Sequence, residues 1–295
     1  MRVIHRNSRS RRTGGQERSM ASPEYCCHVY IVSASDLTQA RLATVAAAAF
    51  IGGIINAIAG GGTLLTFPAL VAAGIPPLTA NATSTVALLP GALSSMHGYR
   101  GELRGMSSWA KRLTLPSLLG GAAGAFLLLH TSNAVFARIV PWLVLAATAL
   151  FIAQRPVMRW ARRHEHSTDS EHVLAERGPS AALLGWQFLI GVYGGYFGAG
   201  VGILMLAALG FMGFTNIHRM NGLKNWGGFC MNLVAAATFA LSGIVIWPVA
   251  LTMAVSATTG GFVGSRLAQR VKPDYVRAFV GIVGILSGLW LLARG

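Results

Sequence analysis

One helix-like face in the second half of the chain combines amides with a single basic residue. Asn221, Lys224, Asn225, Gly228 and Asn232 stand at i, i+3, i+4, i+7 and i+11, which is the spacing of one side of a helix. Amides and an ammonium group donate hydrogen bonds, so such a face can bind an anion. The competing interpretation is that Lys224, about one turn from a connection, reaches the headgroups of a bilayer.

Two glycine-rich stretches could supply further donors. They are Gly60 to Gly62, in the string IAGGGTLL, and Gly198 to Gly202, in the string FGAGVGIL. Backbone N–H groups freed at a helix start attract anions, and glycine lets an anion approach closely. The alternative is that glycine only permits close helix packing. Packing is the favoured interpretation for 120–124 and 260–264, which have small-xxx-small spacing.

The elements that carry these residues are apolar enough to cross a bilayer. The chain is 53% hydrophobic and 11% charged, whereas a soluble domain carries about 25% charged residues. All nine acidic residues lie outside the long apolar segments. We therefore expect an all-α integral membrane protein, with candidate spans at Leu42–Ala59, Leu113–Leu129, Pro141–Ala153, Ala181–Phe197, Phe229–Ser242, Val245–Gly264 and Ala278–Leu292.

The chain also repeats itself. Gly53, Gly60 and Gly62 match Gly191, Gly198 and Gly200 at an offset of 138, and the glycines at 120, 121 and 124 match those at 260, 261 and 264 at 140. At the latter offset, Asn81, Ser84 and Thr85 fall on Asn221, Lys224 and Asn225. The predicted organisation is a basic disordered tail at 1–41, a first transmembrane repeat at 42–153, a linker at 154–180 and a second repeat at 181–295.

The net charge of +15 does not indicate nucleic-acid binding, because the basic residues are confined to connections and chain ends. Matching connections of the two halves exchange their charge, which is typical of inverted repeats. We expect the protein to lie in the inner (plasma) membrane. The charge pattern places 99–112, the linker, 216–220 and 266–277 on the cytoplasmic side. The same charge pattern places the start of the first span outside the cell. The Arg-rich tail before that span favours the opposite side, because basic segments prefer the cytoplasm.

Each repeat begins with a long apolar segment, a glycine-rich break and a short apolar segment. The short segments, Leu64–Ala73 and Ile203–Phe211, must either tilt or form part of a re-entrant hairpin. Asn56, Tyr193 and Tyr196 flank the breaks and could donate hydrogen bonds, although tyrosines also favour membrane interfaces. The predicted substrate-binding residues are Asn56, Gly60, Gly61, Gly62, Asn81, Ser84, Thr85, Gly198, Gly200, Asn221, Lys224 and Asn225.

Enzymatic chemistry finds little support in the motifs. The chain contains no G-x-x-x-x-G-K-[ST] motif for a nucleotide and no H-E-x-x-H motif for zinc, and it has no intramembrane carboxylate. The adjacent Cys26 and Cys27 lack further spaced ligands. We expect no metal, no cofactor and no catalysis. The expected partners are a small anion and the lipid bilayer, and a homo-oligomer is left open.

Four strings resemble the TauE/SafE family of sulfite exporter-like membrane transporters. They are NAIAGGGTLLTFPAL from Asn56, ANATSTVALLPGALSS from Ala80, RMNGLKN from Arg219 and SGIVIWPVALTMAVSATTGGFVGSRLA from Ser242. The resemblance covers about 42–294 and implies two repeats, an inner-membrane location and transport of sulfur-containing anions such as sulfite or organosulfonates. The second break lacks three consecutive glycines, so equal roles for the two breaks do not follow.

The leading hypothesis is thus a secondary transporter of a small, sulfur-containing anion. A facilitative anion channel and a membrane assembly subunit without transport are the alternatives.

Overall fold

A computed structural model describes residues 39–58, 61–98, 106–153, 178–212, 216–267 and 273–294, and the single positions 101, 103, 156 and 214. Most of the predicted tail and of the predicted linker therefore lies outside the described residues. Helix α1 already begins at Gln39, so the last three residues assigned to the tail are helical.

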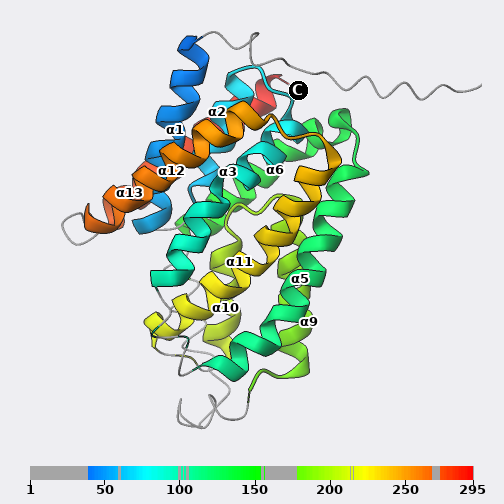
Figure 1. Ribbon diagram of the computed structural model, residues 1–295, viewed down its shortest axis with the longest axis vertical. Helices are drawn as coiled ribbons and strands as arrows, with labels where there is room; N and C mark the ends of the chain where they lie inside the picture. The colour runs from blue at the N-terminus through cyan, green and yellow to red at the C-terminus, as the bar shows by residue number, and fades with distance from the viewer. Residues whose placement is uncertain are drawn as a thin grey trace, which may run out of the picture. The chain divides into compact units, whose positions relative to one another are not determined.

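All the secondary-structure elements in the described residues are helices (Figure 1). The first half contains α1 (Gln39–Ile58), α2 (Thr63–Ala72), α3 (Pro77–Gly98), α5 (Ser107–Leu129) and α6 (Asn133–Ile152). The second half contains α9 (Ala181–Tyr196), α10 (Val201–Phe211), α11 (Ile217–Ser242), α12 (Trp247–Leu267) and α13 (Pro273–Arg294). Ser132, Ser180 and Asn216 cap α6, α9 and α11 by accepting backbone N–H groups of the first turn.

The helices have the length and surface of a membrane protein. Within the described residues, three helices are long and apolar enough to cross a bilayer, at Gln39–Asn56, Ser107–Leu129 and Asn133–Ile152. Large apolar side chains point outward, and Trp142 and Val255 expose 63% and 67% of their surface. Contact with lipid accounts for such a surface. The chain is therefore an all-α membrane protein.

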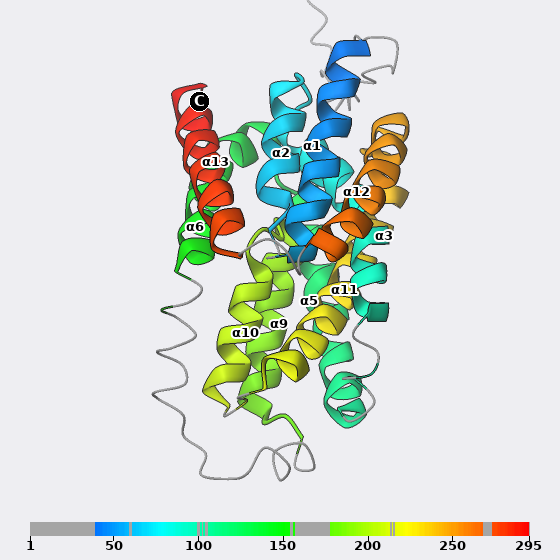
Figure 2. The same ribbon diagram turned by 90° about the vertical axis from the view of Figure 1, so that its left-hand side faces the viewer.

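Each half begins with an antiparallel pair of helices, one long and one short. In the first pair a Cβ on Gly62 would lie 3.3 Å from Asn56 Cβ, and one on Gly52 would lie 2.8 Å from Thr66 Cγ2. In the second pair, Ser180 near the start of α9 contacts Met212 beyond the end of α10. We call α1–α2 and α9–α10 the hairpins, and residues 61–62 and 197–200 their tips. Figure 2 shows α1 beside α2 and α9 beside α10.

The hairpins pack on helices from the opposite half of the chain. Helix α1 packs on α12 and α9 packs on α5, while α3 contacts α11 and α6 contacts α13. Glycine makes the two hairpin contacts close. A Cβ on Gly120 of α5 would overlap the Phe188 carbonyl oxygen of α9, and one on Gly260 of α12 would overlap the Phe50 carbonyl oxygen of α1. These glycines are therefore packing residues.

Two details differ from the sequence-based expectation. Helix α3 runs for 22 residues, although no candidate span was assigned there, because Asn81, Thr83, Ser84 and Thr85 lower its hydropathy. The second break is also shorter than predicted. Helix α10 begins at Val201 after Gly200 in a left-handed conformation, with φ of 74°, so Gly202 lies inside the helix.

Candidate functional site

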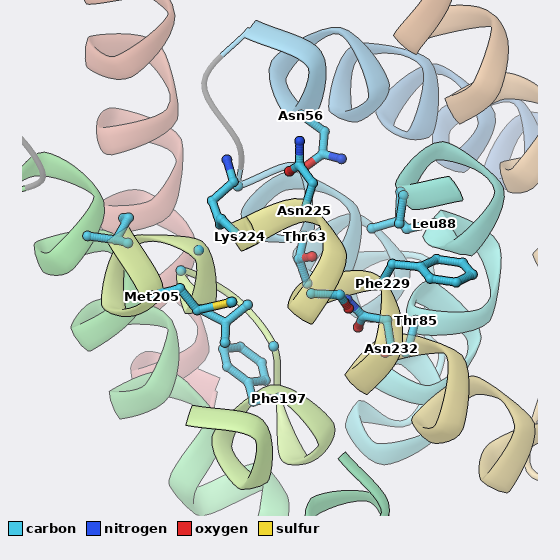
Figure 3. Close-up of a pocket in the computed structure, with 18 of the residues that line it drawn as sticks. Asn56, Thr63, Thr85, Leu88, Phe197, Met205, Lys224, Asn225, Phe229 and Asn232 are labelled. Atoms are coloured by element: carbon cyan, nitrogen blue, oxygen red, sulfur yellow. The ribbon is translucent and has the colours of Figure 1, made fainter. Parts of the chain in front are cut away.

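A cavity of about 160 Å³ lies where the two hairpin tips meet α3, α6 and α11. Figure 3 shows the side chains that point into it. The polar or glycine lining residues are Asn56, Gly61, Thr63, Thr85, Gly198, Gly200, Gly202, Lys224, Asn225, Gly228 and Asn232. Apolar walls are provided by Leu88, Leu89, Ala92, Phe151, Phe197, Val201, Ile203, Met205, Leu206 and Phe229.

Both hairpin tips present the start of a short helix to this cavity. Thr63 is the first residue of α2, and Val201 is the first residue of α10. In α2 the N–H groups of Leu64 and Leu65 donate to the Gly61 and Gly62 carbonyls, and in α10 those of Val201 and Ile203 donate to the Gly198 and Gly200 carbonyls. The N–H groups of Thr63 and Gly202 have no such acceptor among the described residues, and the helix dipole makes both helix starts positive. Gly61, Gly198 and Gly200 have φ of 99°, 79° and 74°, which glycine adopts without strain. The tips can therefore donate hydrogen bonds to a bound anion.

Helix α11 supplies the charge. Lys224, Asn225, Gly228 and Asn232 line the cavity from one face of this helix. The Lys224 stem packs on the first turn of α10, since a Cβ on Gly202 would lie 3.1 Å from Lys224 Cδ. Among the described residues that line the cavity, Lys224 carries the single formal charge and none is acidic. Such a lining is suited to an anion and unsuited to a cation.

The structure brings seven of the predicted substrate-binding residues to the cavity and leaves others outside it. Those that line it are Asn56, Gly61, Thr85, Gly198, Gly200, Lys224 and Asn225. Gly62 is buried against the carbonyl of Gly52, and Asn221 is half-buried on α11 without lining the cavity. Gly60 lies outside the described residues.

Asn81 and Ser84 are buried and connect α3 to the two hairpins. Ser84 Oγ lies 2.8 Å from Thr66 Oγ1 of α2, in a hydrogen bond between two buried hydroxyls. Asn81 Nδ2 donates to the Tyr196 carbonyl at the end of α9, at 3.0 Å. Within the described part of the chain, Asn81 Oδ1 is buried without a hydrogen-bond partner. These two residues hold the hairpins and do not face the cavity.

The second tip has a brace of its own. Tyr193 Oη donates to the Ala199 carbonyl at 2.6 Å, which ties the last turn of α9 to the residue between Gly198 and Gly200. Tyr196 Oη makes a longer contact of 3.5 Å with Thr131 Oγ1. Tyr193 thus donates its hydrogen bond to the tip itself.

Sequence reasoning missed two polar lining residues. Thr63 follows directly on the first glycine break, and its position as the first helical residue could have identified it. Asn232 belongs to the polar stripe of α11 but was left out of the predicted site. It lies about two helical turns beyond Lys224 and lines the same wall of the cavity. The aromatic walls, Phe151, Phe197 and Phe229, have no signal in the sequence that separates them from other apolar residues.

Comparison with known proteins gives consistent results. The family model described as "Sulfite exporter TauE/SafE" matches residues 45–291. A "Probable membrane transporter protein ORF9" of a Sinorhizobium species is 33% identical over 261 residues, which cover 88% of this chain and 95% of that protein. A "Probable membrane transporter protein" of Haemophilus influenzae is 30% identical, over 83% of this chain and 92% of its own length.

A third relative, "Probable membrane transporter protein YfcA" of Escherichia coli K12, is 28% identical, over 83% of this chain and 87% of that protein. No solved structure matches.

Proposed function

Since the chain belongs to the sulfite exporter TauE/SafE family and is a membrane transporter, we propose that it is a secondary transporter of a small anion, specifically a sulfur-containing one such as sulfite or an organosulfonate. The observation that carries the proposal is the composition of the cavity. Two helix starts, several amides and hydroxyls, and the ammonium group of Lys224 converge on a space whose described lining has no carboxylate.

A bound anion would also explain why a lysine lies at this cavity within the membrane. An unpaired charge is expensive within a bilayer, and intramembrane ionisable residues generally face a substrate pathway. Lys224 lies partly buried beside the first turn of α10. A sulfonate or sulfite oxygen would pair with its ammonium group and accept hydrogen bonds from the backbone of the tips. The site would therefore bind substrate most strongly while the cavity is closed to water.

The packing of the helices supports an inverted-repeat architecture. If α1, α2, α3, α5 and α6 correspond to α9, α10, α11, α12 and α13, the largest contacts between the halves have partners. The α1–α12 contact corresponds to α9–α5, and α3–α12 corresponds to α11–α5. Even single residues obey this relation. Phe50 and Phe188 are 138 residues apart, and their carbonyls face Gly260 and Gly120, which are 140 apart.

In the proposed topology the two hairpins enter an inner membrane from opposite sides and meet near its middle. Helices α2 and α10 have 10 and 11 residues, fewer than the roughly 20 needed to cross. Each hairpin would therefore return to its own side. This arrangement places the start of α1 and the chain's C-terminus on one side of the membrane, and both lie at the same end of the helices in Figure 2.

Transport through such a site requires the halves to move against each other. The cavity lies between elements of both halves, so rocking of one hairpin and its partner helix could open it alternately to either side. The close glycine contacts between α5 and α9 and between α1 and α12 indicate that each hairpin moves together with that partner helix.

The test is a flux assay with purified protein in proteoliposomes. Uptake of sulfite, sulfate, thiosulfate and ethanesulfonate is compared with and without an imposed pH gradient or membrane potential. A secondary transporter accumulates its anion above the external concentration when a gradient is imposed. Flux that only equalises the concentrations would indicate a channel, and the absence of flux for every anion would contradict transport of this class.

A further inference from the structure

The cavity has a second polar end, formed by Thr85 of α3 and Asn232 of α11. In Figure 3, Lys224, Asn225 and Asn56 lie at one end of the cavity, and Thr85 and Asn232 lie at the other, with Thr63 between them. We call these the donor end and the acceptor end. The sequence-based site did not contain an acceptor end.

Hydrogen bonds within the helices determine what the acceptor end presents. Thr85 Oγ1 donates its proton to the Asn81 carbonyl at 2.9 Å, so its lone pairs remain for the cavity. Asn232 Nδ2 donates to the Gly228 carbonyl at 2.8 Å. Because a carbonyl can only accept, this bond fixes the orientation of the amide and leaves Asn232 Oδ1 as an acceptor. No described residue donates a recorded hydrogen bond to Asn232 Oδ1.

The two ends are separated by about two turns of α11. Lys224 and Asn232 are eight residues apart on α11, which is ~12 Å along the helix axis. This is the separation of the two backbone positions, and Figure 3 shows the ammonium group of Lys224 and the amide of Asn232 at opposite ends of the cavity. Apart from Thr63, the labelled side chains of the intervening wall are apolar: Leu88, Phe197, Met205 and Phe229. A ligand that contacts both ends therefore needs a short carbon skeleton between two polar groups.

We propose that the substrate is a short organic anion with a hydrogen-bond donor, a hydroxyl or amino group, at the end opposite its acidic group. This deepens the proposed function and rests on it. The acidic group binds at the donor end, against Lys224, Asn225 and the tips. The hydroxyl or amino group donates to Thr85 Oγ1 and Asn232 Oδ1, and the carbon chain lies against the apolar wall. An amino group would bind there as an ammonium group held by these two neutral acceptors, since the described lining has no carboxylate.

Three sulfonates that differ only at the far end test this assignment. Half-saturating concentrations for uptake into proteoliposomes are measured for ethanesulfonate, 2-hydroxyethanesulfonate and 2-aminoethanesulfonate. The donor-bearing compounds should need about 2- to 12-fold lower concentrations than ethanesulfonate, the value of one net hydrogen bond. Asn232→Leu and Thr85→Val should each bring this ratio towards one, mainly by weakening the two donor-bearing compounds.

Thr238→Val is the matched control for Thr85→Val. Thr238 also lies on a helix and donates its hydroxyl to a backbone carbonyl four residues earlier, but it does not line the cavity. Thr238→Val should leave unchanged the ratio of half-saturating concentrations between ethanesulfonate and the donor-bearing sulfonates. If one variant does not fold, the comparison of the three sulfonates in the unmodified protein still tests the proposal.

The outcomes separate this proposal from the general one. Equal half-saturating concentrations for the three sulfonates would overturn the acceptor end while leaving anion transport in place. A ratio that persists in both Asn232→Leu and Thr85→Val would also overturn the assignment to these residues. If the protein moves neither these sulfonates nor any inorganic anion, the proposed function and this inference are both wrong.

Discussion

Replacing Gly120 by alanine should weaken the contact between α5 and α9. The added Cβ would overlap the Phe188 carbonyl oxygen and lie 2.9 Å from Gly191 Cα, where ordinary contacts begin at 3.4 Å. Both neighbours are backbone atoms, so no side-chain rotation can relieve the contact, and the helices must separate to admit the added methyl group. Overpacking of this kind typically costs about 1–3 kcal/mol.

Gly185→Ala is the matched control for this experiment. Gly185 lies on α9, and a Cβ there would meet no atom within 4 Å. Each substitution gains about 1 kcal/mol of helix propensity, so this contribution cancels when the two variants are compared. In reversible unfolding in mixed micelles, we expect Gly120→Ala to be less stable than Gly185→Ala by about 1–3 kcal/mol. Equal stability of the two variants would refute the packing role assigned to Gly120.

Three further predictions concern the tips and the topology. Gly200→Ala places a side chain on a residue with φ of 74°, so it should lower the free energy of unfolding by about 1–2 kcal/mol and slow flux in proteoliposomes. Unchanged flux would mean that this tip does not shape the site. Thr63→Val keeps the shape of the side chain but removes a hydroxyl from the cavity. It should raise the half-saturating anion concentration about 2- to 12-fold, while the thermal stability in detergent stays close to that of the unmodified protein. In a background without other cysteines, Ser242→Cys should react with an impermeant maleimide on intact cells and Ser180→Cys should not; the reverse pattern would contradict the inverted topology.

Much of the cavity could be predicted from residue spacing. The polar stripe placed Lys224 and Asn225 on one face of a helix, and the structure has both in the lining. The glycine breaks likewise predicted two helix starts, and Gly61, Gly198 and Gly200 lie at the cavity. In both cases the information is local, since a helical period or a run of glycines restricts the backbone directly.

Other features depend on how helices rotate against one another, which spacing does not determine. Asn81 and Asn221 match in the repeat, yet neither lines the cavity, and Asn81 is directed to the Tyr196 carbonyl of the opposite half. Ser84 is turned to Thr66 for the same reason. The left-handed conformation of Gly61 also could not be predicted. It makes Gly61→Val a poor probe of anion binding, because the substitution would strain the backbone and strike the Phe151 ring.

The measurement that tests the central claim most directly is the anion dependence of flux in Lys224→Gln. Glutamine keeps much of the length and the hydrogen-bonding ability of lysine but removes the charge. If the ammonium group pairs with the substrate, binding should weaken by about 1–3 kcal/mol, a roughly 5- to 150-fold rise in the half-saturating concentration. Lys224→Arg should retain part of the activity because it keeps the charge. Normal transport by Lys224→Gln at low anion concentration would contradict the account and leave the tips and hydroxyls as the whole site.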